Sequence, residues 1–184
     1  NGARVGPRHV VTWFAAMWAI VFLTSTNLGA DFDIRGQVVV NVVVVFLGGS
    51  LLFIRRHGLD AKTVLSWRLP HPSAWVAVFL GIPAGLVTGI GILRLSQTLF
   101  PAPPEVLQAF GQLVPAGVPI WQLVPLMSIL PGVCEEIAFR GVLLHGLRQS
   151  YSRLVTSLLV GVVFGLFHFS VFRIAQTAYL GVLL

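Results

Sequence analysis

Long apolar runs separated by short polar segments dominate the chain. Five runs contain no Asp, Glu, Lys or Arg over 19 to 29 residues, at positions 10–30, 36–54, 69–93, 106–134 and 154–172. A helix needs roughly 20 residues to cross about 30 Å of hydrocarbon. A sixth apolar run follows at 174–184. The pattern predicts an all-α, polytopic membrane helix bundle with about five to six transmembrane helices.

Composition supports this class and excludes others. Of the 184 residues, 56% are hydrophobic and 10% are charged, whereas a soluble domain carries about 25% charge. The chain is therefore neither a soluble globule nor a disordered polymer. Cys134 is the one cysteine, so a disulfide scaffold is excluded as well.

The distribution of basic residues predicts the topology. Nine of the twelve would lie on one side of the membrane if the five runs span it, namely Arg4, Arg8, Arg55, Arg56, Lys62, Arg68, Arg140, Arg148 and Arg153. This is the positive-inside pattern, and it predicts a cytoplasmic N-terminus. The membrane topology explains why basic residues outnumber acidic ones. We therefore expect these side chains to have the lipid bilayer as their partner, and we expect no nucleic acid.

Two features inside the first three runs predict helix packing. Asn41 is a lone polar residue in a valine-rich run, which favours an interhelical hydrogen bond. Gly81, Gly85 and Gly89 recur every four residues and form a small-residue stripe that lets another helix approach.

The pattern of residue types changes near Phe100, from plain apolar runs to proline-rich and amphipathic sequence. A short amphipathic helix at the membrane interface is predicted, with Val106, Phe110, Leu113 and Val114 on one face and Glu105, Gln108 and Gln112 on the other. Four prolines follow, which predicts that the run 106–134 is broken or kinked: Pro115, Pro119, Pro125 and Pro131. Irregular backbone at membrane depth is tolerated where it is buried in protein or lines a cavity.

Two adjacent carboxylates follow these prolines. Glu135 and Glu136 come at the end of the apolar run, where an ionised carboxylate is costly unless it is paired or hydrated. If a helix restarts after Pro131, Glu136 and Arg140 share a face and can pair, while Glu135 is turned about 100° away and can hold water. Alternatively, both glutamates complement a helix dipole.

A histidine near the end of the fifth run is the second candidate. Gly161, Gly165 and His168 fall at i, i+4 and i+7, so the imidazole shares a face with two glycines that admit a partner helix. His168 can then meet the glutamate of the preceding helix, or it can be a core histidine bonded to a carbonyl group. The other histidines are interpreted as loop or interface residues: His9, His57, His71 and His145.

The pattern Glu135-Glu136-x-x-x-Arg140, followed by Phe164-x-x-x-His168, resembles the first two motifs of the CPBP family of intramembrane proteases, also called the CAAX protease or Abi family. The resemblance covers roughly 117–184. It implies an N-terminal part of the membrane protease domain at 101–184, with variable transmembrane helices at 1–100. The family's third motif, a histidine followed four residues later by Asn or Asp, is absent from the chain, so we expect a fragment that is inactive by itself.

The resemblance implies an intramembrane endopeptidase that cleaves a membrane-associated protein or peptide. Glu135 would be the general base that activates water, and His168 would hold the same water. Glu136 and Arg140 would support the site, with Phe164, Gly161 and Gly165 as structural support. Glu135 and His168 are also candidate metal ligands, which leaves zinc open, since a catalytic zinc usually has three protein ligands.

Two other functions stay open at this point. The chain can be a noncatalytic immunity or scaffold protein of the same family, or a transporter segment whose glutamates serve an ion path. Its compact form suggests a multi-pass protein of a bacterial plasma membrane.

Overall fold

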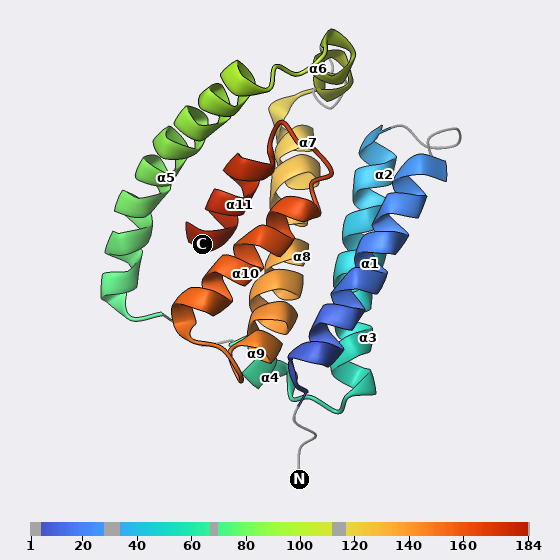
Figure 1. Cartoon of the computed structure of the whole chain (residues 1–184), viewed down its shortest axis with the longest axis vertical. Coiled ribbons are helices and arrows are strands. Elements are labelled where there is room, and N and C mark those ends of the chain that lie inside the picture. Colours follow the sequence, from blue (N-terminus) through green and yellow to red (C-terminus); the bar gives the residue numbers. More distant parts are fainter. Residues whose placement is uncertain (1–4, 28–33, 67–69, 112–116, 184) are drawn as a thin grey trace. The chain divides into compact units, whose positions relative to one another are not determined.

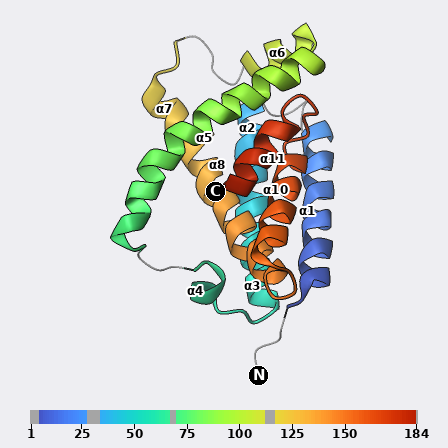
Figure 2. The ribbon, with the colours of Figure 1, turned by 60° about the vertical axis from the view of Figure 1, so that its left-hand side comes forward.

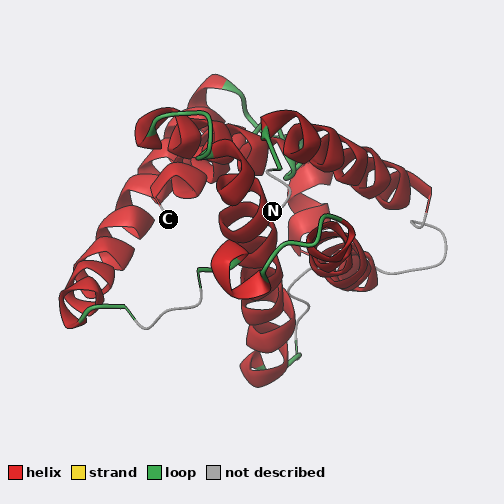
Figure 3. Cartoon of the chain, turned by 90° about the horizontal axis from the view of Figure 1, so that it is seen from below, coloured by secondary structure: helices red, strands yellow, loops and turns green. Residues whose placement is uncertain are grey.

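The computed structural model describes residues 5–27, 34–66, 70–111 and 117–183. Within these ranges every regular element is a helix and no strand occurs (Figure 3), which confirms the all-α class. Three helical stretches in the described ranges are long and apolar enough to cross a membrane: Pro7–Thr26, Arg35–Arg56 and Pro72–Leu99. They correspond to the first three predicted spans and support a helical membrane bundle.

The chain forms two compact units, each built from two separate stretches. The first unit comprises Asn1–Leu65 and Pro103–Tyr151, and the second comprises Ser66–Ala102 and Ser152–Leu184. The sequence predicts a boundary near Phe100, between variable transmembrane helices and the protease-like segment. The two compact units do not test this boundary, and it stays a prediction.

Two long helical runs and one long single helix organise the first unit. The single helix is α1 (Pro7–Asn27). One run joins α2 (Ile34–Val40), the π-helical segment η2 (Asn41–Gly48) and α3 (Gly49–Arg56). The other joins α7 (Ile120–Val124), η3 (Pro125–Ile129), α8 (Leu130–Glu136), η4 (Ile137–Leu143) and α9 (Leu144–Leu147). Figure 1 shows these runs beside α1, and the short helices α4 (Ala61–Val64) and α6 (Pro104–Gly111) complete the unit.

Aromatic side chains fill the core of the first unit. Phe139 of η4 is fully buried, and its ring meets Phe14 of α1 edge-on at 5.4 Å between ring centroids and Phe46 of η2 at 5.7 Å. Edge-to-face aromatic pairs at this separation add about 0.5–1.5 kcal/mol each beyond the burial of their area. These contacts hold the run α7 to α9 against the first two helices.

The predicted hydrogen bond of Asn41 is present. The Thr24 hydroxyl of α1 donates to Oδ1 of Asn41 at 2.5 Å, and Nδ2 of Asn41 donates to the Ser25 hydroxyl at 3.3 Å. Asn41 is buried, and a buried amide is costly unless it is bonded. The two helices are therefore joined by polar groups at this level.

The fourth predicted run, 106–134, is broken as predicted, since one helix ends at Gly111 and another begins at Ile120, but its boundaries as a span are wrong. A short helix is present at Pro104–Gly111, whereas the helical run continues from Ile120 to Leu147 through Pro125 and Pro131. Gln112, Leu113, Val114 and Pro115 lie outside the described residues. The helix does not restart after Pro131, because η3 precedes it and its hydrogen bonds reach five residues back, as from the Leu130 N–H to the Pro125 carbonyl.

The second unit contains α5 (Pro72–Leu99), α10 (Arg153–Leu166) and α11 (Ile174–Leu183). Figure 2 shows α10 and α11 side by side as a hairpin, and α11 also packs against α5. A Cβ atom on Gly85 would lie 2.6 Å from Leu183, and one on Gly89 would lie 3.6 Å from Leu180. Two of the three glycines in the predicted stripe therefore face a neighbouring helix, whereas Gly81 has open space around it.

The fifth predicted span, 154–172, is too long. The helix α10 ends at Leu166 after 14 residues, and His168 lies in the following turn. Fourteen residues cover only about 21 Å, short of the hydrocarbon thickness. Phe169, two residues past the C-cap Phe167, adopts a left-handed conformation with φ of 46°, which glycine adopts most readily. The sequence therefore lacks the usual signal for the helix end.

Glycines on α10 bring α11 into close contact. A Cβ atom on Gly161 would lie 2.7 Å from the Ala178 carbonyl oxygen and would clash with Val182. A Cβ atom on Gly165 would lie 3.0 Å from the Ala178 side chain. The helix that approaches this glycine face is therefore the following helix of the hairpin.

We expect Gly161→Ala to destabilise the hairpin by about 1–3 kcal/mol, because the added methyl group meets backbone that cannot turn aside. Thermal unfolding of the protein in detergent measures the loss. Gly91→Ala on α5 is the matched control, since Gly91 has no atom within 4 Å of an added Cβ, and it should raise stability by about 0.5–1 kcal/mol. Equal unfolding temperatures for the two variants would contradict the packing described.

Candidate active site

The two adjacent glutamates lie at the end of α8, where the helix widens into η4. Cys134 before them and Ala138 after them are buried, whereas Glu135 is half-buried and the Glu136 side chain is 51% exposed. Segments of π-helix are rare and often occur at functional sites. The core contacts of Phe139 place this segment within the first unit.

A short capped helix supports the same segment. Asp60 caps α4 by accepting hydrogen bonds from the Thr63 N–H at 2.9 Å and the Thr63 hydroxyl at 2.6 Å. These bonds lower the pKa of the Asp60 carboxyl below its usual value. Leu65, which follows α4, packs against Gly141 of η4, where an added Cβ would lie 2.7 Å from the leucine side chain. The polypeptide after α3 is thereby held against the glutamate-bearing helix.

Glu136 and Arg140 form the predicted ion pair. Nη1 of Arg140 lies 3.1 Å from Oε1 of Glu136, and the arginine side chain is only 16% exposed. The pair joins consecutive turns of the helix, as four-residue spacing allows. It leaves Glu136 committed to a neighbour on its own helix.

Glu135 is in a different situation. Within the described part of the chain, its carboxylate makes no hydrogen bond or ion pair. A half-buried carboxylate without a protein partner needs water or a ligand to satisfy its lone pairs. Of the two glutamates, Glu135 is therefore the one that is available for chemistry.

His168 is held by the helix that precedes it. Its Nδ1 lies 2.9 Å from the Phe164 carbonyl oxygen, and its ring meets the Phe164 ring at 4.8 Å between centroids. A carbonyl oxygen only accepts hydrogen bonds, so Nδ1 must carry the proton and donate it. In the neutral imidazole, Nε2 is then the nitrogen with a free lone pair. The carbonyl bond that the sequence left open as an alternative is present, and it selects a tautomer suited to holding water.

The glutamates and the histidine belong to different compact units. Glu135, Glu136 and Arg140 lie in the first unit, and Gly161, Phe164, Gly165 and His168 lie in the second. The predicted meeting of Glu135 with His168 stays a prediction.

The described residues do not by themselves make up a zinc site. Among them, no group of three or more His, Cys, Asp or Glu side chains is close enough together to hold a metal ion. Glu135 and His168 supply two candidate ligands, whereas a catalytic zinc usually has three from the protein. The proposed mechanism therefore assigns no step to a metal ion.

Comparison with known proteins bears on the C-terminal segment. Residues 117–184 match the model of a family described as type II CAAX prenyl endopeptidase Rce1-like. The match covers both motifs and begins and ends where the sequence resemblance does. No curated protein and no solved structure matches the chain.

Proposed function

Since residues 117–184 match the model of the type II CAAX prenyl endopeptidase Rce1-like family, we propose that the protein hydrolyses a peptide bond of a membrane-associated protein or peptide. The observation that carries the proposal is the contrast between the two neighbouring glutamates. Glu136 is paired with Arg140, whereas Glu135 makes no hydrogen bond or ion pair within the described residues. A site that needs one carboxylate to accept a proton would be built in this way.

Glu135 is the general base in this proposal. Its carboxylate accepts a hydrogen bond from water and then the proton itself, which makes the water oxygen nucleophilic. The fixed pair of Glu136 and Arg140 next to it keeps a positive charge one turn away, and this limits the cost of a carboxylate at membrane depth. Arg140 and Glu136 are therefore positioning residues.

His168 orients the same water. Because Nδ1 is committed to the Phe164 carbonyl group, Nε2 accepts the second hydrogen of the water molecule. With both hydrogens bound to acceptors, a lone pair of the water oxygen is directed at the carbonyl carbon of the substrate. Glu135 thus accepts the proton, and Glu135 and His168 together fix the orientation of the water molecule.

The reaction balances without a cofactor. The water oxygen forms a bond to the peptide carbonyl carbon, and one water proton moves to Glu135. Glu135 then returns this proton to the amide nitrogen as the carbon–nitrogen bond breaks, which releases a carboxylic acid, still carrying the second water proton, and an amine. The family's third motif, a histidine followed four residues later by Asn or Asp, would stabilise the oxyanion that forms between these steps.

The proposal is tested with the protein expressed from its whole gene and reconstituted in lipid vesicles. We expect cleavage of a farnesylated peptide that ends in a CAAX sequence, detected by mass spectrometry, with an unprenylated copy to define the substrate class. Cys134→Ala should cleave as fast as the wild type, because the thiol is buried away from solvent and takes no part in water activation.

Two outcomes would contradict the proposal. Loss of cleavage in Cys134→Ala, with unchanged unfolding temperature, would indicate a cysteine nucleophile in place of an activated water. Cleavage of neither peptide by the folded wild-type protein would favour the noncatalytic scaffold.

A further inference from the structure

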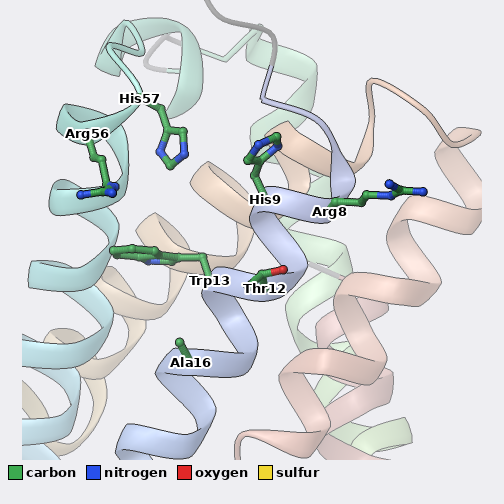
Figure 4. A pocket seen from close by; sticks show the side chains of 7 residues that line it. All are labelled: Arg8, His9, Thr12, Trp13, Ala16, Arg56 and His57. Atoms are coloured by element: carbon green, nitrogen blue, oxygen red, sulfur yellow. The ribbon is translucent and has the colours of Figure 1, made fainter.

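A basic pocket lies in the first unit, away from the two glutamates. It has a volume of about 520 Å³ and lies between the beginning of α1 and the end of α3. Figure 4 shows Arg8 and His9 on α1 and, across the pocket, Arg56 and His57. The indole ring of Trp13 lies below them, between the two helices. The sequence indicates interface residues at His9 and His57, but it does not show that they line one pocket.

No acid balances the charge of this pocket. None of the side chains that line it is a carboxylate, and neither Arg8 nor Arg56 pairs with one in the described part of the chain. Arginine keeps its charge at any physiological pH and presents several donors to one anion. Two unpaired guanidinium groups on facing helices therefore favour a ligand with negative charge.

The histidines add directed hydrogen-bonding groups. Nδ1 of His57 donates to the Phe53 carbonyl oxygen at 3.0 Å, which leaves Nε2 as the other polar atom of the ring. The ring of His9 meets the ring of His57 edge-on, at 5.9 Å between centroids. Figure 4 shows the two imidazoles and Arg56 between the two helices, whereas the Arg8 side chain extends from α1 away from them.

The pocket lies where two membrane-spanning helices reach the end of their apolar stretches. The first candidate span begins at Pro7 and the second ends at Arg56, which would place the basic side chains at the level of the lipid headgroups. The ring of Trp13 packs on Phe53 at 5.4 Å and forms an apolar floor. One turn beyond the pocket on the same helical faces, Ile20 is 48% exposed and Leu52 is 56% exposed.

We propose that this pocket binds an anionic phospholipid, with the phosphate beside Arg56 and the two imidazoles, with Arg8 adding positive charge at the rim, and with an acyl chain along Trp13 and the exposed apolar residues below it. A headgroup that also carries an ammonium ion would find no carboxylate in the pocket to pair with it. The pocket therefore selects lipids with net negative charge, such as phosphatidylglycerol, over zwitterionic ones. Basic pockets between transmembrane helices are a known form of lipid recognition.

Native mass spectrometry of the detergent-solubilised protein tests the proposal, with dioleoyl-phosphatidylglycerol and dioleoyl-phosphatidylcholine as probes. We expect the wild type to bind phosphatidylglycerol at least about tenfold more tightly, and R8Q/R56Q to lose about tenfold or more of this affinity. The matched control is R55Q/K62Q, which removes the same charge from residues that do not line the pocket. It should bind phosphatidylglycerol like the wild type.

Three outcomes would overturn the proposal. Equal losses in R8Q/R56Q and R55Q/K62Q would mean that surface charge alone attracts the lipid. Equal affinity of the wild type for the two lipids would remove the selectivity. Displacement of phosphatidylglycerol by millimolar inorganic phosphate would identify a site for free phosphate. Thermal unfolding of each variant shows that it is folded, and none of these results depends on peptide cleavage.

Discussion

Glu135→Gln is expected to lower the rate of peptide cleavage about 10²- to 10⁴-fold, which is the contribution of a positioned general base. Glutamine keeps the size and the hydrogen-bonding oxygen of the side chain, but it cannot accept the proton of the water. The half-buried Glu135 carboxylate has no hydrogen bond or ion pair within the described residues. Its replacement should therefore leave the fold intact, which an unchanged unfolding temperature would show. The value of kcat, measured in lipid vesicles, then gives the effect on cleavage.

Glu136→Gln separates the two glutamates. It breaks the ion pair with Arg140 but leaves the proposed base in place, so we expect a smaller loss of kcat. We also expect a loss of stability of about 1 kcal/mol or more, since an exposed pair is worth about 0–1 kcal/mol but Arg140 is mostly buried and would lose this partner. Glu105→Gln on α6 removes a carboxylate outside the proposed site and should change neither. If Glu136→Gln abolished cleavage and Glu135→Gln did not, the assigned roles would be reversed.

Features that depend on a few neighbouring residues could be predicted from the sequence. The first three spans follow from the length of apolar runs, and the bonds of Asn41 follow from the cost of a lone amide among valines. The pairing of Glu136 with Arg140 follows from four-residue spacing on a helix. In each case the physical cause lies within one or two turns of chain.

Features set by unusual backbone could not be predicted. The rule that proline ends a helix assumes α-helical hydrogen bonds, and the π-helical segment before Pro131 removes that assumption. The turn that follows α10 contains Phe169 in a left-handed conformation, and no glycine marks it in the sequence. Both errors concern the proposed site, because they move Glu135 into the interior of a helical run and His168 out of its helix.

Local geometry also cannot identify the functional histidine. Phe53 and His57 repeat the arrangement of Phe164 and His168, with Nδ1 bonded to the carbonyl oxygen four residues back and with the two rings in contact. The difference between the two histidines lies in what surrounds Nε2. His57 lies beside Arg56 and across a basic pocket from His9, whereas His168 belongs to the segment that matches the protease family. The family match therefore distinguishes His168 from His57, which the local arrangement of phenylalanine and histidine does not.

His168→Ala is expected to lower kcat about 10²-fold or more, because the water loses the acceptor that orients it. The same change removes one hydrogen bond to a carbonyl group, which should cost about 1 kcal/mol of stability. His57→Ala removes an equivalent bond and ring contact, so its unfolding temperature gives the structural cost alone. His71→Ala, at the start of α5, should keep the wild-type cleavage rate.

Added imidazole distinguishes a chemical role of His168 from a structural one. If Nε2 holds the water, free imidazole should restore part of the cleavage by His168→Ala, because it supplies the same acceptor without repairing the fold. It should not rescue Glu135→Gln, which lacks the base. Wild-type activity in His168→Ala would remove this residue from the mechanism. A loss of activity matched by a much lower unfolding temperature than that of His57→Ala, without rescue, would make His168 a structural residue of the α10–α11 turn.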